Sequence, residues 1–124
     1  MSRPAEPSDG AGAVAALVEE MATRLRRFGT RHWRETLDGG RTAGDLVHEL
    51  VGSLARREAA LSPQCDPDEV PERPPYDAAL ADQLAVVGHD LADALAKHGD
   101  PGASGEVLAE LGDYAARLRL PLDS

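Results

Sequence analysis

The chain has 124 residues and a formal net charge of −9, with only one Trp, one Phe and two Tyr. This length favours a single domain whose small core must be built mainly from Ala, Leu and Val. No stretch approaches the roughly 20 consecutive apolar residues of a membrane span, and the first residues do not resemble a secretory signal, so we expect a cytoplasmic protein.

The net charge is unevenly distributed along the chain. Residues 1–62 carry nine arginines and nine acidic residues, whereas residues 63–124 hold the whole excess of negative charge. An acidic half argues against general nucleic-acid binding, which needs a basic surface to neutralise phosphates. Cys65 is the only cysteine, so no internal disulfide can form, and its acidic neighbours disfavour a reactive thiolate.

The first helix is predicted near the N-terminus. Residues 1–12 are rich in Pro, Ser, Gly and Glu, and we expect a disordered tail there. From about Ala13, apolar residues recur every three or four positions as far as Phe28, which predicts an amphipathic helix. Either this helix breaks at Gly29 and Thr30 caps a short second piece through Leu37, or one long helix tolerates Gly29.

The second long helix has clear limits. Residues 38–40, Asp-Gly-Gly, end the preceding segment, because glycine suits the left-handed position after a helix. Thr42 and Asp45 then resemble a capping box with Asp in place of Glu, and the helix that they open runs to about Leu61. Residues 64–75 contain four prolines and four acidic residues, which predicts a long connection.

Residues 76–98 give the clearest helical signal in the chain. Five apolar residues fall on one side of this predicted helix, and we expect the other helices to pack against them. Gly88, inside it, either marks a close approach of two helices or reflects the glycine-rich composition. The five residues of the apolar stripe are Leu80, Leu84, Val87, Leu91 and Leu95.

A last helix completes the predicted fold. Residues 99–102, Gly-Asp-Pro-Gly, separate it from the previous helix, Ser104 is its predicted cap, and Pro121 ends it. No strand pattern is visible. The sequence therefore predicts an all-α, four-helix bundle over residues 13–122, with a break of the first helix near Gly29 as one alternative and a long proline-rich connection between the second and third helices.

Two histidines are candidate metal ligands. His89 lies opposite the apolar stripe, four residues before Asp93, and His48 is the histidine of the second helix that could join it, with Glu49 beside it. One hypothesis is a divalent metal site formed by His48, Glu49 and His89. The other is that these residues lie on solvated helix faces, which the lack of HExxH or HxxxH spacing favours. We find no catalytic constellation and expect no cofactor.

A basic stretch surrounds the only tryptophan. Arg and Trp are common hot-spot residues of protein interfaces, so the stretch indicates recognition of an anion or a protein partner. The alternatives are that the arginines complement a helix dipole, or that the acidic connection of residues 66–72 folds back over them. Trp33 itself is more typical of a core-edge anchor. The candidate interaction residues are Arg24, Arg27, Arg31, Trp33 and Arg34.

Two stretches resemble known families. Residues 82–91, DQLAVVGHDL, are similar to a segment of small uncharacterised actinobacterial helical proteins, which implies no known activity. Trp33 followed by residues 42–50, TAGDLVHEL, resembles the start of the second helix in DinB-like four-helix proteins. Many members of that family bind a metal through three histidines and act as thiol-dependent transferases or isomerases. The family's first metal histidine falls on Glu49, and its later paired histidines have no counterpart here, so the resemblance supports the bundle more than the chemistry.

The expected function is that of a non-catalytic helical bundle acting through protein–protein contact. We expect a homodimer with the third or fourth helix at its two-fold axis, because Ala85, Val86, Ala92 and residues 118–122 supply apolar surface beyond what one chain needs. The alternatives are a small metal-dependent enzyme of the DinB-like type and a ligand-binding regulator with a pocket between helices.

Overall fold

The computed structural model describes residues 7–62 and 71–121. It is 77% helical, without a strand in the described part, which confirms the all-α helical bundle. None of the described helices is long and apolar enough to cross a membrane. In chain order the elements are α1 (Pro7–Leu25), α2 (Thr30–Arg34), the 3-10 helix η1 (Asp38–Gly40), α3 (Ala43–Leu61), α4 (Ala79–His98) and α5 (Pro101–Arg117).

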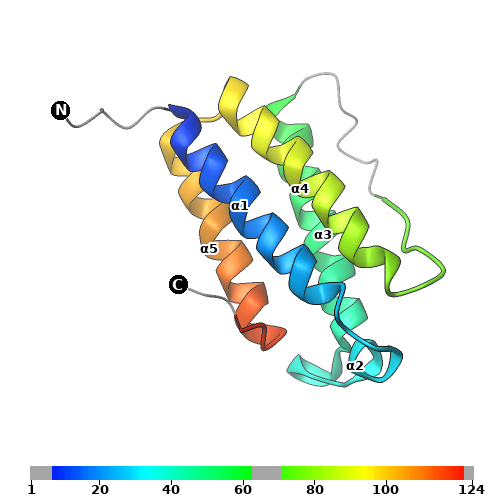
Figure 1. Ribbon diagram of the computed structural model, residues 1–124. Helices are drawn as coiled ribbons and strands as arrows, with labels where there is room; N and C mark the ends of the chain where they lie inside the picture. The colour runs from blue at the N-terminus through cyan, green and yellow to red at the C-terminus, as the bar shows by residue number, and fades with distance from the viewer. Residues whose placement is uncertain (1–6, 63–70, 122–124) are drawn as a thin grey trace.

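The four long helices pack side by side, and the short α2 lies at one end of the bundle (Figure 1). Helix α4 packs extensively on both α1 and α3, whereas α5 packs on α1 and makes fewer contacts with α3. The apolar stripe of α4 is buried along its whole length, as the sequence predicts. Relative exposure is zero at Leu80, Leu84 and Leu91, and is 8% at Val87 and 2% at Leu95.

A glycine sets the distance between α1 and α4. A β-carbon placed on Gly88 would overlap both γ-methyl groups of Val18 in α1. The close-approach interpretation of Gly88 is therefore confirmed. Helices α1 and α5 meet in a similar way, because a β-carbon on Gly10 would lie 2.7 Å from Cβ of the buried Ser104.

The N-terminal helices differ in detail from the sequence prediction. Helix α1 begins at Pro7, so residues 7–12 are helical where a tail is predicted, and the reason is that the apolar stripe extends back to the buried Ala11. Residues 1–6 lie outside the described part. The break at Gly29 is confirmed, but Gly29 occupies the N-cap position that the sequence assigns to Thr30, and α2 ends at Arg34, not Leu37.

Of the caps predicted for the later helices, one is confirmed and one is wrong. At α3 the predicted capping box forms, with Thr42 Oγ1 accepting from the Asp45 N–H and Asp45 Oδ2 accepting from the Thr42 N–H, both at 3.1 Å. At α5 the predicted cap Ser104 is wrong. Asp100 caps this helix by accepting from the Ala103 N–H at 2.7 Å, since Pro101 suits the first helical position.

Candidate functional site

Two of the predicted metal ligands face different neighbours. His89 projects from α4 toward α1, where its Nε2 lies 2.7 Å from Oε2 of Glu19, and not toward Asp93. His48 projects from α3 toward the described end of the proline-rich connection, with Nε2 lying 3.4 Å from the carbonyl oxygen of Pro71. The two imidazoles are therefore engaged on different sides of the bundle.

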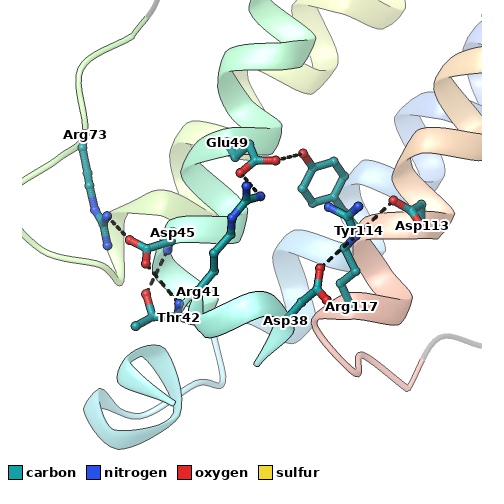
Figure 2. Close-up of polar contacts among 9 residues, drawn as sticks. All are labelled: Asp38, Arg41, Thr42, Asp45, Glu49, Arg73, Asp113, Tyr114 and Arg117. Atoms are coloured by element: carbon teal, nitrogen blue, oxygen red, sulfur yellow. Dashed lines mark hydrogen bonds and ion pairs between the residues drawn. The ribbon is translucent and has the colours of Figure 1, made fainter. Parts of the chain in front are cut away.

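The third predicted ligand, Glu49, faces α5. Its Oε1 accepts a hydrogen bond from the Tyr114 hydroxyl at 2.7 Å, and its Oε2 pairs with Arg41 (Figure 2). Neighbouring residues of a helix point in directions about 100° apart, so Glu49 cannot face the same way as His48. Among the described residues, no group of three or more His, Cys, Asp or Glu could hold a metal ion. The predicted metal site of His48, Glu49 and His89 is thus not assembled.

Glu49 belongs instead to a series of polar contacts between α3 and α5, which we call the polar ladder. After the contact of Glu49 with Tyr114, Ser53 Oγ donates to Glu110 Oε2 at 2.7 Å and Arg57 Nε donates to Glu110 Oε1 at 2.8 Å. Residues four apart lie on one face of a helix, so the contacts repeat at each turn along two antiparallel helices. Among the neighbouring pairs of long helices, the ladder joins the pair with the fewest contacts.

The electrostatics of the ladder favour a structural role. The hydrogen bond from Tyr114 lowers the pKa of Glu49, and the ion pair with Arg41 lowers it further. Burial, and then the hydrogen bond to Glu49, raise the pKa of Tyr114 to about 12. A carboxylate held ionised beside a phenol held neutral has no proton to exchange near neutral pH, whereas a general acid or base needs a pKa near the working pH.

Two further arginines form ion pairs with carboxylates near α3. Arg117 lies 3.4 Å from Asp38 of η1 and 3.3 Å from Asp113 (Figure 2). Arg73 lies 2.6 Å from Asp45 and 3.1 Å from Asp77, and the hydrogen bond from Arg73 is the main cause of a lowered pKa at Asp45. Each of these guanidinium groups has its carboxylate partner within the chain.

The predicted interaction residues lie around α2 and are of two kinds. Trp33 is only 2% exposed and packs edge-to-face on Phe28, with 5.2 Å between ring centroids, which confirms its role as a core-edge anchor. Arg27, Arg31 and Arg34 are exposed and form no ion pair with the residues that the structure describes. Arg24 is partly buried and already has an interaction, so it does not belong to this exposed set.

A groove of about 500 Å³ lies between α2 and residues 75–78. Phe28, Trp33 and Arg34 line it from the α2 side, and Tyr76, which is 75% exposed, lines it from the other segment. Tyr76 is absent from the predicted interaction residues, because the sequence places it inside the third predicted helix, whereas α4 begins only at Ala79. We define the α2 surface as Arg27, Phe28, Arg31, Trp33, Arg34 and Tyr76.

The apolar surface on which the dimer prediction depends is largely covered within the chain. Ala85 and Ala92 are 8% and 6% exposed, because α4 is in contact with both α1 and α3. Leu118 and Leu120 are 0% and 9% exposed. That part of the argument is therefore wrong, and among the predicted positions that the structure describes only Val86 is a large exposed hydrophobic side chain, at 61%.

A second hollow, of about 180 Å³, lies between α3, α4 and α5. Its lining is mainly apolar, with Leu91, Leu95 and Val107 among its walls and Arg57 as one polar member.

The acidic residues 66–70 and Cys65 lie outside the described part, so their predicted roles stay predictions. Comparison of the chain with protein-family models, curated proteins and solved structures gave no match.

Proposed function

We propose that this chain is a non-catalytic helical bundle that binds a partner protein through the α2 surface. The observation that carries the proposal is a set of three exposed arginines on and before α2, Arg27, Arg31 and Arg34. They have no carboxylate partner in the described chain, and Arg34 lines an aromatic-lined groove. Arg56 and Arg119 are also exposed without such a partner, whereas five other described arginines have one. They are Arg26, Arg41, Arg57, Arg73 and Arg117.

The composition of the α2 surface suits protein recognition. Arg, Trp and Tyr are the residues most enriched among binding hot spots, because they combine a large contact area with a polar group. Tyr76 exposes an aromatic ring to water beside a groove whose walls are the rigid side chains of Phe28 and Trp33. A partner that covers this ring would gain apolar burial and could pair with the arginines.

The test is photo-crosslinking in the natural host, with a photoreactive amino acid replacing Tyr76. We expect one protein to be captured from this position, and capture to fall when Arg31→Glu and Arg34→Glu are combined. Arg56→Glu is the matched control, because Arg56 is an exposed arginine of α3 that has no described ion pair. Equal capture in both backgrounds, or capture only from a crosslinker at Val86, would contradict the proposal.

The partner class includes a second copy of the chain. The homodimer stays a prediction, supported now by the exposed Val86 and Tyr76 rather than by the covered positions. The net charge of −9 makes two copies repel, so a dimer should strengthen as salt is added. Light scattering across concentration and salt decides this point, and the proposal places the protein in the cytoplasm, as the sequence predicts.

A second candidate function is that of a ligand-binding regulator. The apolar hollow between α3, α4 and α5 favours it, because ligand sites are typically concave and mainly apolar with a few polar groups. Native mass spectrometry of the purified protein is the test. A retained small molecule that is lost on Val107→Trp, which would fill the hollow, would support this function, and an unchanged bound mass would oppose it.

A further inference from the structure

We infer that the partner contributes an acidic, extended segment, which lies in the groove between α2 and residues 75–78. This inference rests on the proposed function and names the chemistry of the partner. Three observations support it, namely the charge of α2, the aromatic lining of the groove and a donor on Trp33 that has no partner among the described residues.

The charge of α2 calls for a negatively charged partner. Arg31 and Arg34 are three residues apart and so lie on neighbouring positions of one helix face. The nearest acid in sequence, Glu35, follows the helix and lies 3.9 Å from His32 instead. Guanidinium groups match the planar geometry of carboxylates and can bind them through two parallel hydrogen bonds. Carboxylates of a partner would thus complement these two arginines, which have no carboxylate partner among the described residues.

The small size of the basic patch favours a peptide over a nucleic acid. A nucleic acid carries one negative charge per nucleotide and needs a broad basic surface for binding, whereas the net charge of this chain is −9. Of the three arginines of the α2 surface, only Arg34 lines the groove, where Asp77 is also part of the wall. A short run of acidic residues matches a patch of this size.

The aromatic lining of the groove favours an extended segment. Its walls come from one short helix and from residues 75–78, with Phe28, Trp33, Pro75 and Tyr76 among them. A hollow of about 500 Å³ has room for several side chains of a bound segment. Aromatic-lined grooves are known to bind extended, proline-containing peptides in other proteins, because such peptides lose little conformational freedom on binding.

Trp33 supplies the third observation. Its Nε1 is buried and has no hydrogen-bond partner among the described residues, and an indole nitrogen can only donate. Buried donors without a partner are rare in folded proteins. Trp33 also lines the groove, but it is only 2% exposed, so its ring would have to shift for a carbonyl or carboxylate oxygen of the partner to accept from Nε1.

The experiment uses Trp33 as its reporter, because it is the only tryptophan of the chain. The probe is the blocked peptide EEEPLEEE, titrated against the full-length protein while the indole emission is followed. The controls are the blocked peptide KKKPLKKK and a single-stranded oligothymidine of about the same length. We expect saturable binding of the acidic peptide only, weakened at least about tenfold by Arg31→Glu with Arg34→Glu and changed less than about twofold by Arg56→Glu.

Other outcomes would overturn the inference. Equal binding of both peptides would remove the charge argument, and displacement of the acidic peptide by oligothymidine would assign the groove to nucleic acid. An emission change on dilution without peptide would make a second copy the occupant. The neutral pair Arg31→Gln with Arg34→Gln, checked for helix content, guards against loss of folding. A partner crosslinked at Tyr76 that lacks an acidic segment would overturn this inference alone, whereas the lack of any crosslinked protein would overturn the proposed function.

Discussion

Arginine has opposite surroundings in two regions of this molecule. In the polar ladder, Arg57 lies between α3 and α5 and donates to Glu110 at 2.8 Å, with Glu106 a further 3.8 Å contact. On the α2 surface, Arg31 and Arg34 are exposed and have no carboxylate partner among the described residues. The same residue type therefore joins helices in one region and leaves its charge uncompensated in the other.

This difference separates residues that maintain the fold from residues that are free for binding. Removing a partner from the ladder would leave a half-buried charge without its counter-ion, which destabilises the folded state. Removing an exposed, unpaired arginine changes little inside the chain, since surface substitutions away from specific contacts are close to neutral. Stability measurements can therefore distinguish the arginines of the two regions before any partner is known.

The largest expected loss of stability comes from substitutions in the hydrophobic core. Leu84→Ala removes a side chain with no exposure from the stripe of α4 and should lower the free energy of unfolding by about 2–5 kcal/mol, as should Leu91→Ala. Urea denaturation measures this loss. A change below about 0.5 kcal/mol would show that the stripe does not form the core.

The next largest effect should come from the polar ladder. Glu110→Ala removes the acceptor of both Ser53 and Arg57, and we expect a loss of about 1–3 kcal/mol, because hydrogen bonds to charged groups are the stronger ones. Glu106→Ala is the matched control, since the Glu106 side chain is 74% exposed and lies 3.8 Å from Arg57. Its cost should stay below about 0.5 kcal/mol. Equal costs for the two variants would remove the ladder as a stabilising element.

Tyr114→Phe should cost about 0.5–1.5 kcal/mol near neutral pH, through loss of the hydrogen bond to Glu49. It should also change the dependence of stability on pH. The pKa of Tyr114 is raised from 10.0 to about 12 in the folded state, so its contribution is complete below pH 10 and is lost as the pH rises toward 12.

At acid pH the dependence of stability on pH has the opposite sign. The pKa of Glu49 is lowered from 4.5, so its contribution is present above that pH and is lost as the pH falls through the lowered value. Tyr114→Phe should therefore flatten both limbs of the stability curve, measured by denaturation across pH. Tyr76→Phe is the control, because the Tyr76 ring is 75% exposed. Parallel curves for Tyr114→Phe and the wild-type chain would contradict the role of this contact.

The smallest effect on stability should come from the α2 surface. The combined Arg31→Glu and Arg34→Glu variant should unfold within about 0.5 kcal/mol of the wild-type chain, because neither arginine has a described ion pair to lose. Thermal denaturation at matched salt checks this expectation. A loss as large as that of Glu110→Ala would mean that these arginines stabilise the fold.

The sequence predicts the fold better than the site, for physical reasons. Apolar periodicity and the pairing of Thr42 with Asp45 are local signals, and they place the helices within a few residues of their observed bounds. The start of α5 was misplaced because two local candidates compete, and Asp100 before Pro101 makes a better cap than Ser104. Local chemistry decides such boundaries.

The site depends on contacts between distant parts of the chain. Glu49 contacts Tyr114, whereas His89 contacts Glu19. These pairings follow from the order of the helices around the bundle, which apolar periodicity does not specify. The basic stretch around Trp33 was found from composition. Its groove was not, because Tyr76 reaches it from a segment more than 40 residues away along the chain.

The most direct test of the central claim is a charge exchange between the α2 surface and its peptide. The wild-type chain and the Arg31→Glu with Arg34→Glu variant are each titrated with EEEPLEEE and KKKPLKKK, with Trp33 emission as the readout. Contact between these side chains and the peptide predicts a reversed preference, in which the variant binds the lysine peptide and loses the glutamate peptide. If the variant binds neither peptide while remaining folded, or keeps the wild-type preference, the α2 arginines do not contact the bound segment and the account is wrong.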